Sequence, residues 1–336
     1  MVAGSYRTLL KESFKSNETE EWLDIWFTRP IGLALALVCG RLGITPNAIT
    51  MVGISLGAAA GWMFHYTDLW HNVAGVALLM TANFCDSADG QLARLTNQKT
   101  LLGRMLDGFA SDVWFFCVYL AIVFRLWNTP IPFTDAAWQW WGFLLCAVAG
   151  LHCHSTQCAL ADYYRNIHLW FLKGDSGSEL DSYAKEQAIY DRLKTQGWTF
   201  ERIYHFFYKG YCRKQERLTP KFQVFFRDLN RSLTVANNDI SHFSFPISHS
   251  SFLISLTNGQ SVALQSHFLS GSRPLMPLTN ILTHNTRAFA LFFAVLVNIP
   301  WLYPLFEIVV LQPLYWWMRY RHELLCGTLT RSYENN

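Results

Sequence analysis

Residues 86–112 read DSADGQLARLTNQKTLLGRMLDGFASD, and four aspartates stand in this stretch between two apolar segments. Acidic side chains at membrane depth are energetically costly, so carboxylates in such a place indicate a functional site. Asp86 and Asp89 are three residues apart and share one face of a helix. Asp107 falls in the first turn of the next predicted helix, where a carboxylate also complements the helix dipole. If the two helices are neighbours, three carboxylates converge at the membrane boundary.

The composition of the whole chain is typical of a membrane protein. Of its 336 residues 51% are hydrophobic and only 15% are charged, whereas a soluble domain carries about a quarter charged residues. The apolar residues form long runs, and the 14 tryptophans suit membrane interfaces. A net charge of +3 without a basic stripe gives no reason to expect nucleic acid as a partner. The eight cysteines form no CxxC pair, so neither a disulfide framework nor a zinc site is expected.

We therefore predict an all-α integral membrane protein built as a six-transmembrane-helix bundle. An N-terminal interfacial helix precedes the bundle, and a cytoplasmic insertion separates spans four and five. The polar N-terminus has no apolar core with a cleavage site, so we expect no signal peptide. The predicted spans cover about 47–65, 70–88, 104–125, 136–160, 288–302 and 304–320.

The same reasoning divides the chain into four parts. They are the cytoplasmic N-terminus with its interfacial helix (1–45), the catalytic membrane half with spans one to four (46–172), the cytoplasmic insertion (173–285), and spans five and six with the tail (286–336). Within the insertion we expect amphipathic helices from 173 to about 234. Residues 236–285 are Ser/His-rich with weak strand character around 251–264, which indicates a hairpin or an insertion without assignable chemistry.

Lysine and arginine positions predict the orientation of the six spans. The short loops 66–70 and 300–304 contain no basic residue, and the loop 126–135 has only Arg125 at its edge. Because basic residues accumulate on the cytoplasmic side, both termini, residues 89–103 and the insertion are predicted to be cytoplasmic.

The carboxylate cluster would repel itself unless a cation compensates its charge. An all-oxygen ligand set selects a hard ion such as Mg²⁺ or Mn²⁺, and such an ion commonly holds phosphate oxygens and polarises a phosphoryl group. The alternative to a metal site is that the two aspartates of the DxxD pattern lie at a helix end and are simply solvated. Two kinds of neighbour favour a phosphate substrate: small residues that leave room for it (Gly90, Ala93 and Gly103) and cations that bind its charge (Arg94, Lys99 and Arg104).

The string Asp86-xx-Asp89-Gly90-xx-Ala93-Arg94, followed after eight residues by Gly103-xxx-Asp107, resembles the signature of the CDP-alcohol phosphatidyltransferase family. The resemblance extends to Thr45-Pro46-Asn47-xx-Thr50 and covers about residues 29–125. It implies two Mg²⁺ or Mn²⁺ ions that bind the diphosphate of a CDP-linked donor. An acceptor hydroxyl would attack the β-phosphorus and CMP would leave, as in phospholipid biosynthesis. At least one of the two substrates would be a lipid, and members of the family commonly form homodimers.

One position departs from the family pattern. The family motif places a fourth aspartate four residues after the third, as a metal ligand and candidate base, but this position is Ser111 and the carboxylate follows at Asp112. On an ideal helix Ser111 is rotated by about 40° from Asp107 and Asp112 by about 140°. A widened π-turn, for which Gly108 makes the backbone permissive, would bring Asp112 into the site. Otherwise Ser111 fills the position, or the protein is an inactive relative. We prefer Asp112, because a carboxylate stands directly beside the vacant position.

Residues farther along the chain each have a structural and a functional interpretation. Asp162 and Arg165 suit an ion pair that anchors a helix at the interface, or recognition of the acceptor headgroup. His152 and His154 suit core or interhelical hydrogen bonds better than metal binding. Arg287 is expected to be a positive-inside residue, or a phosphate contact.

The sequence therefore predicts a metal-dependent transferase that moves a phosphoalcohol from a CDP-alcohol to a hydroxyl acceptor and releases CMP. The competing hypothesis is a catalytically inactive relative that binds nucleotide lipids or regulates a membrane partner, for which Ser111 is the supporting feature. A transporter is less consistent with the sequence, because no internal repeat is present and the carboxylates lie at the membrane boundary rather than at its midplane.

Overall fold

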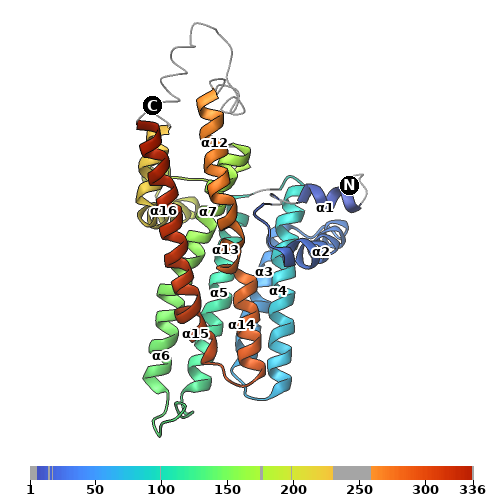
Figure 1. Cartoon of the computed structure of the whole chain (residues 1–336). Coiled ribbons are helices and arrows are strands. Elements are labelled where there is room, and N and C mark those ends of the chain that lie inside the picture. The colour runs from blue at the N-terminus through green and yellow to red at the C-terminus, as the bar shows by residue number, and fades with distance from the viewer. Residues whose placement is uncertain are drawn as a thin grey trace. The chain divides into compact units, whose positions relative to one another are not determined.

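The computed structural model describes residues 6–13, 16, 18–98, 100–174, 177–197, 199–229 and 259–334. In these ranges the regular structure is helical, as predicted, and the only β-type pairing is an isolated bridge between Pro130 and Ala137 (Figure 1). The chain divides into two compact units. Unit 1 comprises Met1–Ser155 and His284–Gln312, and unit 2 comprises Thr156–Thr283 and Pro313–Asn336. The four-part division by membrane topology stays a prediction.

Unit 1 contains the helices that carry the family motif. In chain order its elements are α1 (Tyr6–Ser13), the π-helical η1 (Asp24–Thr28), α2 (Arg29–Arg41), α3 (Pro46–Phe64), α4 (Leu69–Leu95), α5 (Leu101–Leu126), α6 (Gln139–Ala147), the π-helical η2 (Val148–His154), α14 (His284–Leu296), α15 (Leu302–Phe306) and the π-helical η7 (Glu307–Leu311). A turn separates α14 from α15, and Asn298 adopts a positive φ of 60° there.

Three helices of unit 1 begin at side-chain caps. Thr45 accepts a hydrogen bond from the backbone N–H of Ala48 at the start of α3, and Asp68 and Thr100 do the same for α4 and α5. Such caps satisfy N–H groups that have no partner inside the helix. The polar residues between the apolar runs therefore determine where the motif-bearing helices begin.

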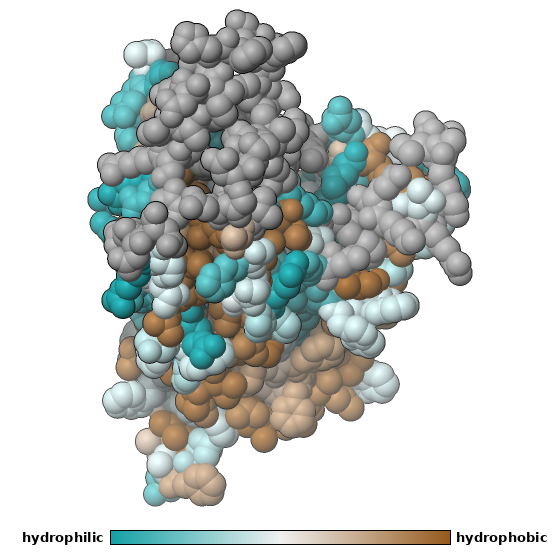
Figure 2. Space-filling view, turned by 45° about the horizontal axis from the view of Figure 1, so that its top comes forward, coloured by the Kyte–Doolittle hydropathy of each residue, from teal (hydrophilic) through white to brown (hydrophobic). Residues whose placement is uncertain are grey.

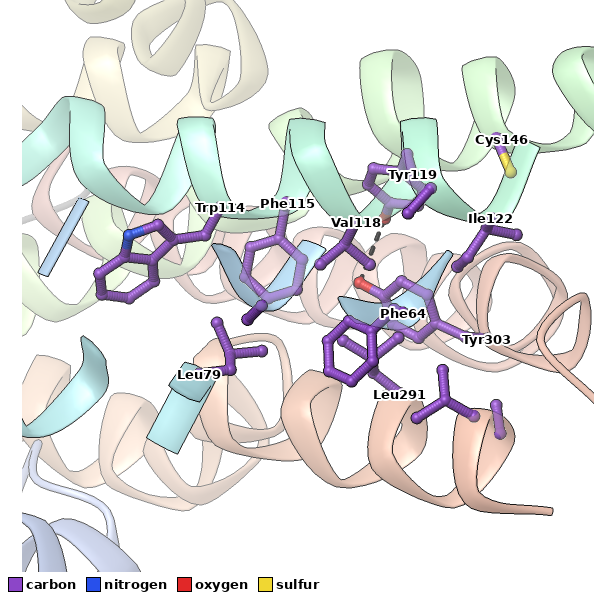
Figure 3. Close-up of a cluster of buried hydrophobic side chains, with 14 of the residues drawn as sticks. Phe64, Leu79, Trp114, Phe115, Val118, Tyr119, Ile122, Cys146, Leu291 and Tyr303 are labelled. Carbon is purple, nitrogen blue, oxygen red and sulfur yellow. Dashed lines mark hydrogen bonds between the residues drawn. The ribbon is translucent and has the colours of Figure 1, made fainter. Parts of the chain in front are cut away.

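The core of unit 1 forms where α3, α4 and α5 pack together. A side chain at Gly61 would place its Cβ 2.6 Å from Cys117 Cβ, and one at Gly57 would collide with the ring of Trp114. The small residues of α3 therefore permit its close contact with α5. Around this contact lie buried side chains of several helices, including Phe64, Leu79, Phe115, Val118 and Leu291 (Figure 3).

Within the described ranges, three helices are long and apolar enough to cross a membrane: Pro46–Phe64, Leu101–Leu126, and the continuous helix Gln139–Lys173. They coincide with predicted spans one, three and four, whereas the count of six spans stays a prediction. Large apolar side chains reach the surface along these helices, among them Phe116, Phe124, Trp140 and Trp141. Hydrophobic patches on the surface are visible in Figure 2. Such exposure suits a hydrocarbon environment rather than water.

Unit 2 is built from α7 (Ser155–Lys173, from Thr156 on), α8 (Tyr183–Leu193), η4 (Lys194–Gln196), α9 (Phe200–Leu218), a helix over 220–229, α12 (Gly259–Ser272), η6 (Arg273–Leu275), α13 (Met276–Ile281) and α16 (Gln312–Glu334, from Pro313 on). Its interior is aromatic. The ring of Phe268 stacks on Phe171 at 3.9 Å between centroids, and Phe225 stacks against both. The helices α8 and α9 occupy the segment where amphipathic helices were expected.

The strand character expected around 251–264 is wrong for residues 259–264, which lie in α12. Residues 251–258 lie outside the described part of the chain. Further along the same helix Phe268 and Leu269 are buried in the aromatic core. Burial of this apolar pair on one helical face outweighs the weak strand preference of the polar residues around it.

Candidate active site

The three motif aspartates come together from two helices of unit 1. Asp86 and Asp89 lie on consecutive turns of α4, and Asp107 lies on the second turn of α5. The carboxyl groups of Asp86 and Asp107 are in hydrogen-bond contact, and Asp89 is an electrostatic neighbour of both. Asp89 is buried, with 4% of its surface exposed. The structure therefore places the three carboxylates in one cluster.

Thr50 completes this cluster, although the sequence did not single it out as a site residue. Its hydroxyl donates a hydrogen bond to Asp89 Oδ2 and lies 3.1 Å from the backbone oxygen of Pro46. In the same turn of α3, Asn47 Oδ1 would be 2.9 Å from a Cβ at Gly103. The segment from Thr45 to Thr50 therefore brings the start of α3 against both carboxylate-bearing helices. The signal was present, because Thr50 belongs to the quoted motif.

Two arginines lie beside the carboxylates. Arg94 folds back over Gly90. A Cβ atom added at Gly90 would lie 3.4 Å from Arg94 Nη1. The Nε of Arg94 is buried, with no hydrogen-bond partner among the described residues. Arg29, which the sequence did not single out, is an electrostatic neighbour of Arg94 and Asp86, and its Nη2 lies 2.8 Å from Glu20 Oε1. A buried donor beside a carboxylate cluster suits an anionic ligand with bridging cations.

The other predicted phosphate-binding residues lie near the turn between α4 and α5. The carbonyl of Ala93 accepts a hydrogen bond from the Gln98 amide at 2.9 Å, which closes the end of α4. Gly103 and Arg104 lie in the first turn of α5, and the Arg104 side chain is exposed. Lys99 lies outside the described residues.

The widened turn that would bring Asp112 into the cluster is absent. From Leu101 to Leu126 α5 is an α-helix without interruption. Ser111 therefore lies about 40° around the helix from Asp107, whereas Asp112 lies about 140° away. Asp112 is exposed and shares its face with Phe116, which is 63% exposed. The geometry gives the fourth motif position to Ser111.

A second polar cluster is buried deeper in unit 1. Glu307 Oε1 lies 2.7 Å from Tyr303 Oη, 3.0 Å from Arg287 Nε and 3.3 Å from His154 Nδ1. Tyr303 Oη in turn lies 3.3 Å from Tyr119 Oη, and the two side chains face each other in Figure 3. His154 and Glu307 stand on the π-helical segments η2 and η7, so irregular helix geometry occurs at this cluster.

This cluster adds to one expectation and confirms another. Arg287 is wholly buried and ion-paired with Glu307, while its interpretation as a positive-inside residue stays a prediction. Its partner Glu307 lies twenty residues further along the chain, at the start of η7, and counting charges by position does not reveal this pairing. The interhelical hydrogen bonding expected at His154 is present. Glu307 was missed, although a lone acidic residue inside a predicted span signals a buried partner.

Asp162 and Arg165 lie on α7 in unit 2, and each is held within that unit. Asp162 Oδ2 accepts hydrogen bonds from Tyr211 Oη at 3.1 Å and from Gln215 Nε2 at 3.2 Å. Arg165 Nη2 donates to Asn280 Oδ1 at 2.6 Å. These contacts tie α7 to α9 and to α13, which is an anchoring role. Headgroup recognition by this pair stays a prediction.

In the described part of the chain, no group of three or more histidine, cysteine, aspartate or glutamate side chains is arranged to hold a metal ion. The Asp89 carboxylate is turned toward Thr50, while Asp86 and Asp107 contact each other. The donor set nevertheless has the chemistry of a hard-ion site, because every ligand is a carboxylate oxygen. Two carboxyl groups in direct contact also need a shared proton or a cation between them.

Comparisons with known proteins agree with the motif. Residues 43–169 match the family model of CDP-alcohol phosphatidyltransferase. The archaetidylinositol phosphate synthase of Pyrococcus horikoshii is 38% identical over 77 residues, which are 23% of this chain and 37% of that protein. No solved structure matches the chain. Residues 43–169 therefore match this family over the stretch that carries the motif, which confirms the resemblance found in the sequence.

Proposed function

We propose that this protein transfers a phosphoalcohol group from a CDP-alcohol to a hydroxyl acceptor with release of CMP, in phospholipid biosynthesis. The observation that supports the proposal most directly is the convergence of Asp86, Asp89 and Asp107 within the matched family domain. From the family we carry over only the substrate classes. They are a CDP-linked donor and a hydroxyl acceptor, and at least one of these two substrates is a lipid. The chain spans about 37% of the length of its curated relative.

Mg²⁺ or Mn²⁺, as two ions, would be held by Asp86, Asp89 and Asp107, with Ser111 at the fourth position. When bound, the ions would supply positive charge against the donor diphosphate. For this the Asp89 carboxylate must exchange its hydrogen bond with Thr50 for the ion. The contact between Asp86 and Asp107 supports the assignment, because a cation would replace the shared proton that this contact requires.

Arg94 and Gly90 would meet the diphosphate of the donor. The guanidinium of Arg94 lies over Gly90, and its buried Nε has no hydrogen-bond partner in the described ranges. Arg29 adds a second cation within electrostatic reach of Arg94. An arginine fork matches phosphate oxygens, so these residues would orient the β-phosphorus toward the acceptor.

The reaction balances as a displacement at phosphorus. An oxygen of the acceptor hydroxyl forms a new bond to the β-phosphorus, and the bond from that phosphorus to the bridging oxygen breaks. The bridging oxygen leaves with its electron pair as part of CMP, and the hydroxyl proton passes to a base. The products are a phosphodiester, CMP and one proton.

We further propose that all six predicted spans cross the membrane and that both termini and the carboxylate cluster face the cytoplasm. Three spans are supported by helix length and apolarity. The orientation is supported by the distribution of lysine and arginine. Homodimer formation stays a prediction from the family resemblance.

The product can be identified by comparing the lipids of cells with and without the gene. We expect one phosphodiester lipid to be lost on deletion, restored by the wild-type gene and not restored by the Asp89→Asn variant expressed at the same level. Unchanged lipid profiles under conditions in which the gene is expressed would contradict the proposal.

A second candidate function is favoured by Ser111, which leaves the fourth motif position without a carboxylate. In that case the protein would bind a CDP-linked lipid and regulate a membrane partner without turnover. Equilibrium binding separates the two functions: metal-dependent binding of a CDP-alcohol without CMP release would favour this second function.

A further inference from the structure

The geometry of α5 leaves the proposed reaction without its expected base. Ser111 lies on the same face as Asp107, but a serine hydroxyl does not accept a proton from an alcohol near neutral pH. Asp112 lies on the opposite side of an uninterrupted α-helix. The three clustered aspartates are the proposed ligands of the metal ions. The motif therefore leaves the proton of the acceptor hydroxyl without a carboxylate to accept it.

The imidazole of His284 packs against the residues of α5 that lie one helical turn beyond Ser111. The ring centroid of His284 is 5.9 Å from that of Trp114 and 5.7 Å from that of Phe115. These aromatic residues follow Ser111 by three and four positions and so continue its face of α5. Side chains on a helix lean toward its N-terminus. The rings that contact His284 therefore lean toward the turn that contains Ser111.

Contacts of the neighbouring residue place the start of α14 independently. Asn285 Nδ2 donates hydrogen bonds to Glu21 Oε2 at 2.7 Å and to Asp24 Oδ1 at 3.0 Å. The same segment runs directly into Arg29, which is an electrostatic neighbour of Asp86 and of Arg94. The first turn of α14 is thus attached to the segment that borders the carboxylate cluster.

The surroundings of the His284 ring suit a proton acceptor. Among the described residues no group forms a hydrogen bond with the ring, and its side chain is half-buried rather than sealed in the core. The charged and titratable groups that face it are Arg287 and His154. Burial lowers the pKa of His284, and the charges of His154 and Arg287 lower it further, so the imidazole rests neutral with one nitrogen lone pair available.

We propose that His284 is a catalytic residue that accepts the proton of the acceptor hydroxyl, in place of the carboxylate missing at position 111. This proposal rests on the proposed transferase function. As the acceptor oxygen bonds to the β-phosphorus, its proton moves to a ring nitrogen of His284 while CMP leaves with the electron pair of the broken bond. The imidazolium then returns its proton to water, which regenerates the neutral ring.

The test uses the full-length protein in detergent or vesicles with a CDP-alcohol on which the wild type releases CMP. We expect His284→Gln to lower kcat at least 100-fold with the donor KM within threefold, since general-base catalysis contributes about 10²–10⁴-fold. The residual rate should increase with pH where the wild-type rate is level. His152→Gln is the matched control, because His152 is exposed on η2, and it should retain wild-type kcat.

A second variant shows whether the lost group is a base. Adding Ser111→Asp to His284→Gln returns a carboxylate to the motif position, and we expect kcat to increase at least tenfold over the single variant. Unchanged donor binding by both variants excludes misfolding as the cause of a loss. The proposal is overturned if His284→Gln retains kcat within threefold, if its loss lies in donor KM, or if Ser111→Asp gives no rescue. If the wild type releases no CMP from any donor, the transferase function itself has failed.

Discussion

Thr50 and Ser111 show how single residues refine the carboxylate site. Thr50 binds the carboxylate of Asp89, so the start of α3 belongs to the site and is more than a helix cap. Ser111 lies on the face of α5 that continues from Asp107, while Asp112 lies on an exposed face. The site in this chain therefore differs from the family pattern at one side chain, and this difference decides where a base must be sought.

Exchanging Asp112 tests that conclusion at the scale of one residue. We expect Asp112→Asn to change kcat less than threefold, because its carboxylate is about 140° around α5 from Asp107. CMP release is the measurement, with Asp107→Asn as the control that should lose activity. A loss with Asp112→Asn as large as with Asp107→Asn would mean that the turn widens when substrate binds.

The motif aspartates and their helices could be predicted because the spacing of charges in a sequence maps directly onto a helix face. The roles of Arg287 and Glu307 could not, because their pairing joins residues twenty positions apart across a turn and is stabilised by burial rather than by local pattern. His284 carried no sequence signal either. Its proposed role depends on which α5 side chains it contacts.

At the scale of helices, Arg125 joins three elements at one end of unit 1. Its Nη1 donates to the backbone oxygen of Phe64 at 2.9 Å and to Asn72 Oδ1 at 2.8 Å. Its Nη2 donates to Asn298 Oδ1 at 2.6 Å. The sequence placed Arg125 at a loop edge, but it is a buried cap of α3 that also fixes α4 and the turn after α14.

Removing this guanidinium should destabilise the protein. We expect Arg125→Met to cost about 2–4 kcal/mol, because a buried carbonyl and two amide oxygens lose a charged donor. The measurement is thermal unfolding in detergent, with Arg192→Met, an exposed position on α8, as the matched control. Equal midpoints for the two variants would show that water replaces the guanidinium at no cost.

The π-helical segments η2 and η7 bring His154 to the ion pair of Arg287 and Glu307. Breaking one side of a buried pair leaves an uncompensated charge, which costs about 3–5 kcal/mol. We therefore expect Glu307→Gln to lower the unfolding midpoint strongly. The double variant Arg287→Met/Glu307→Gln should recover much of the loss. A single variant as stable as the wild type would show that the pair contributes no net stability.

At the scale of the whole molecule, the described part of the chain is helical, and residues 43–169 match the family model of CDP-alcohol phosphatidyltransferase. Fold class followed from composition and hydropathy, since long apolar runs permit few structures in a membrane. Three of the predicted spans meet the criteria of length and apolarity. The other predicted spans carry the polar motif or are interrupted by turns and prolines, so they do not meet the criteria of length and hydropathy.

Cysteine labelling in intact cells tests the predicted orientation. Six of the eight native cysteines are buried and two are half-buried, so background labelling should be low. We expect a membrane-impermeant maleimide to label Asp135→Cys from outside the cell. Lys194→Cys, in the predicted cytoplasmic insertion, should be labelled only after the membrane is opened. The reverse pattern would contradict the topology.

The most direct test of the proposed transferase is CMP release by the purified protein. CDP-alcohols of both kinds, lipid-linked and headgroup-linked, are supplied with hydroxyl acceptors in the presence of Mn²⁺ or Mg²⁺. We predict metal-dependent CMP release from one donor, abolished by chelation and reduced at least 100-fold in a folded Asp89→Asn variant, since this carboxylate would hold the ion. Absence of CMP release from every donor, or release that Asp89→Asn leaves unchanged, would contradict the account.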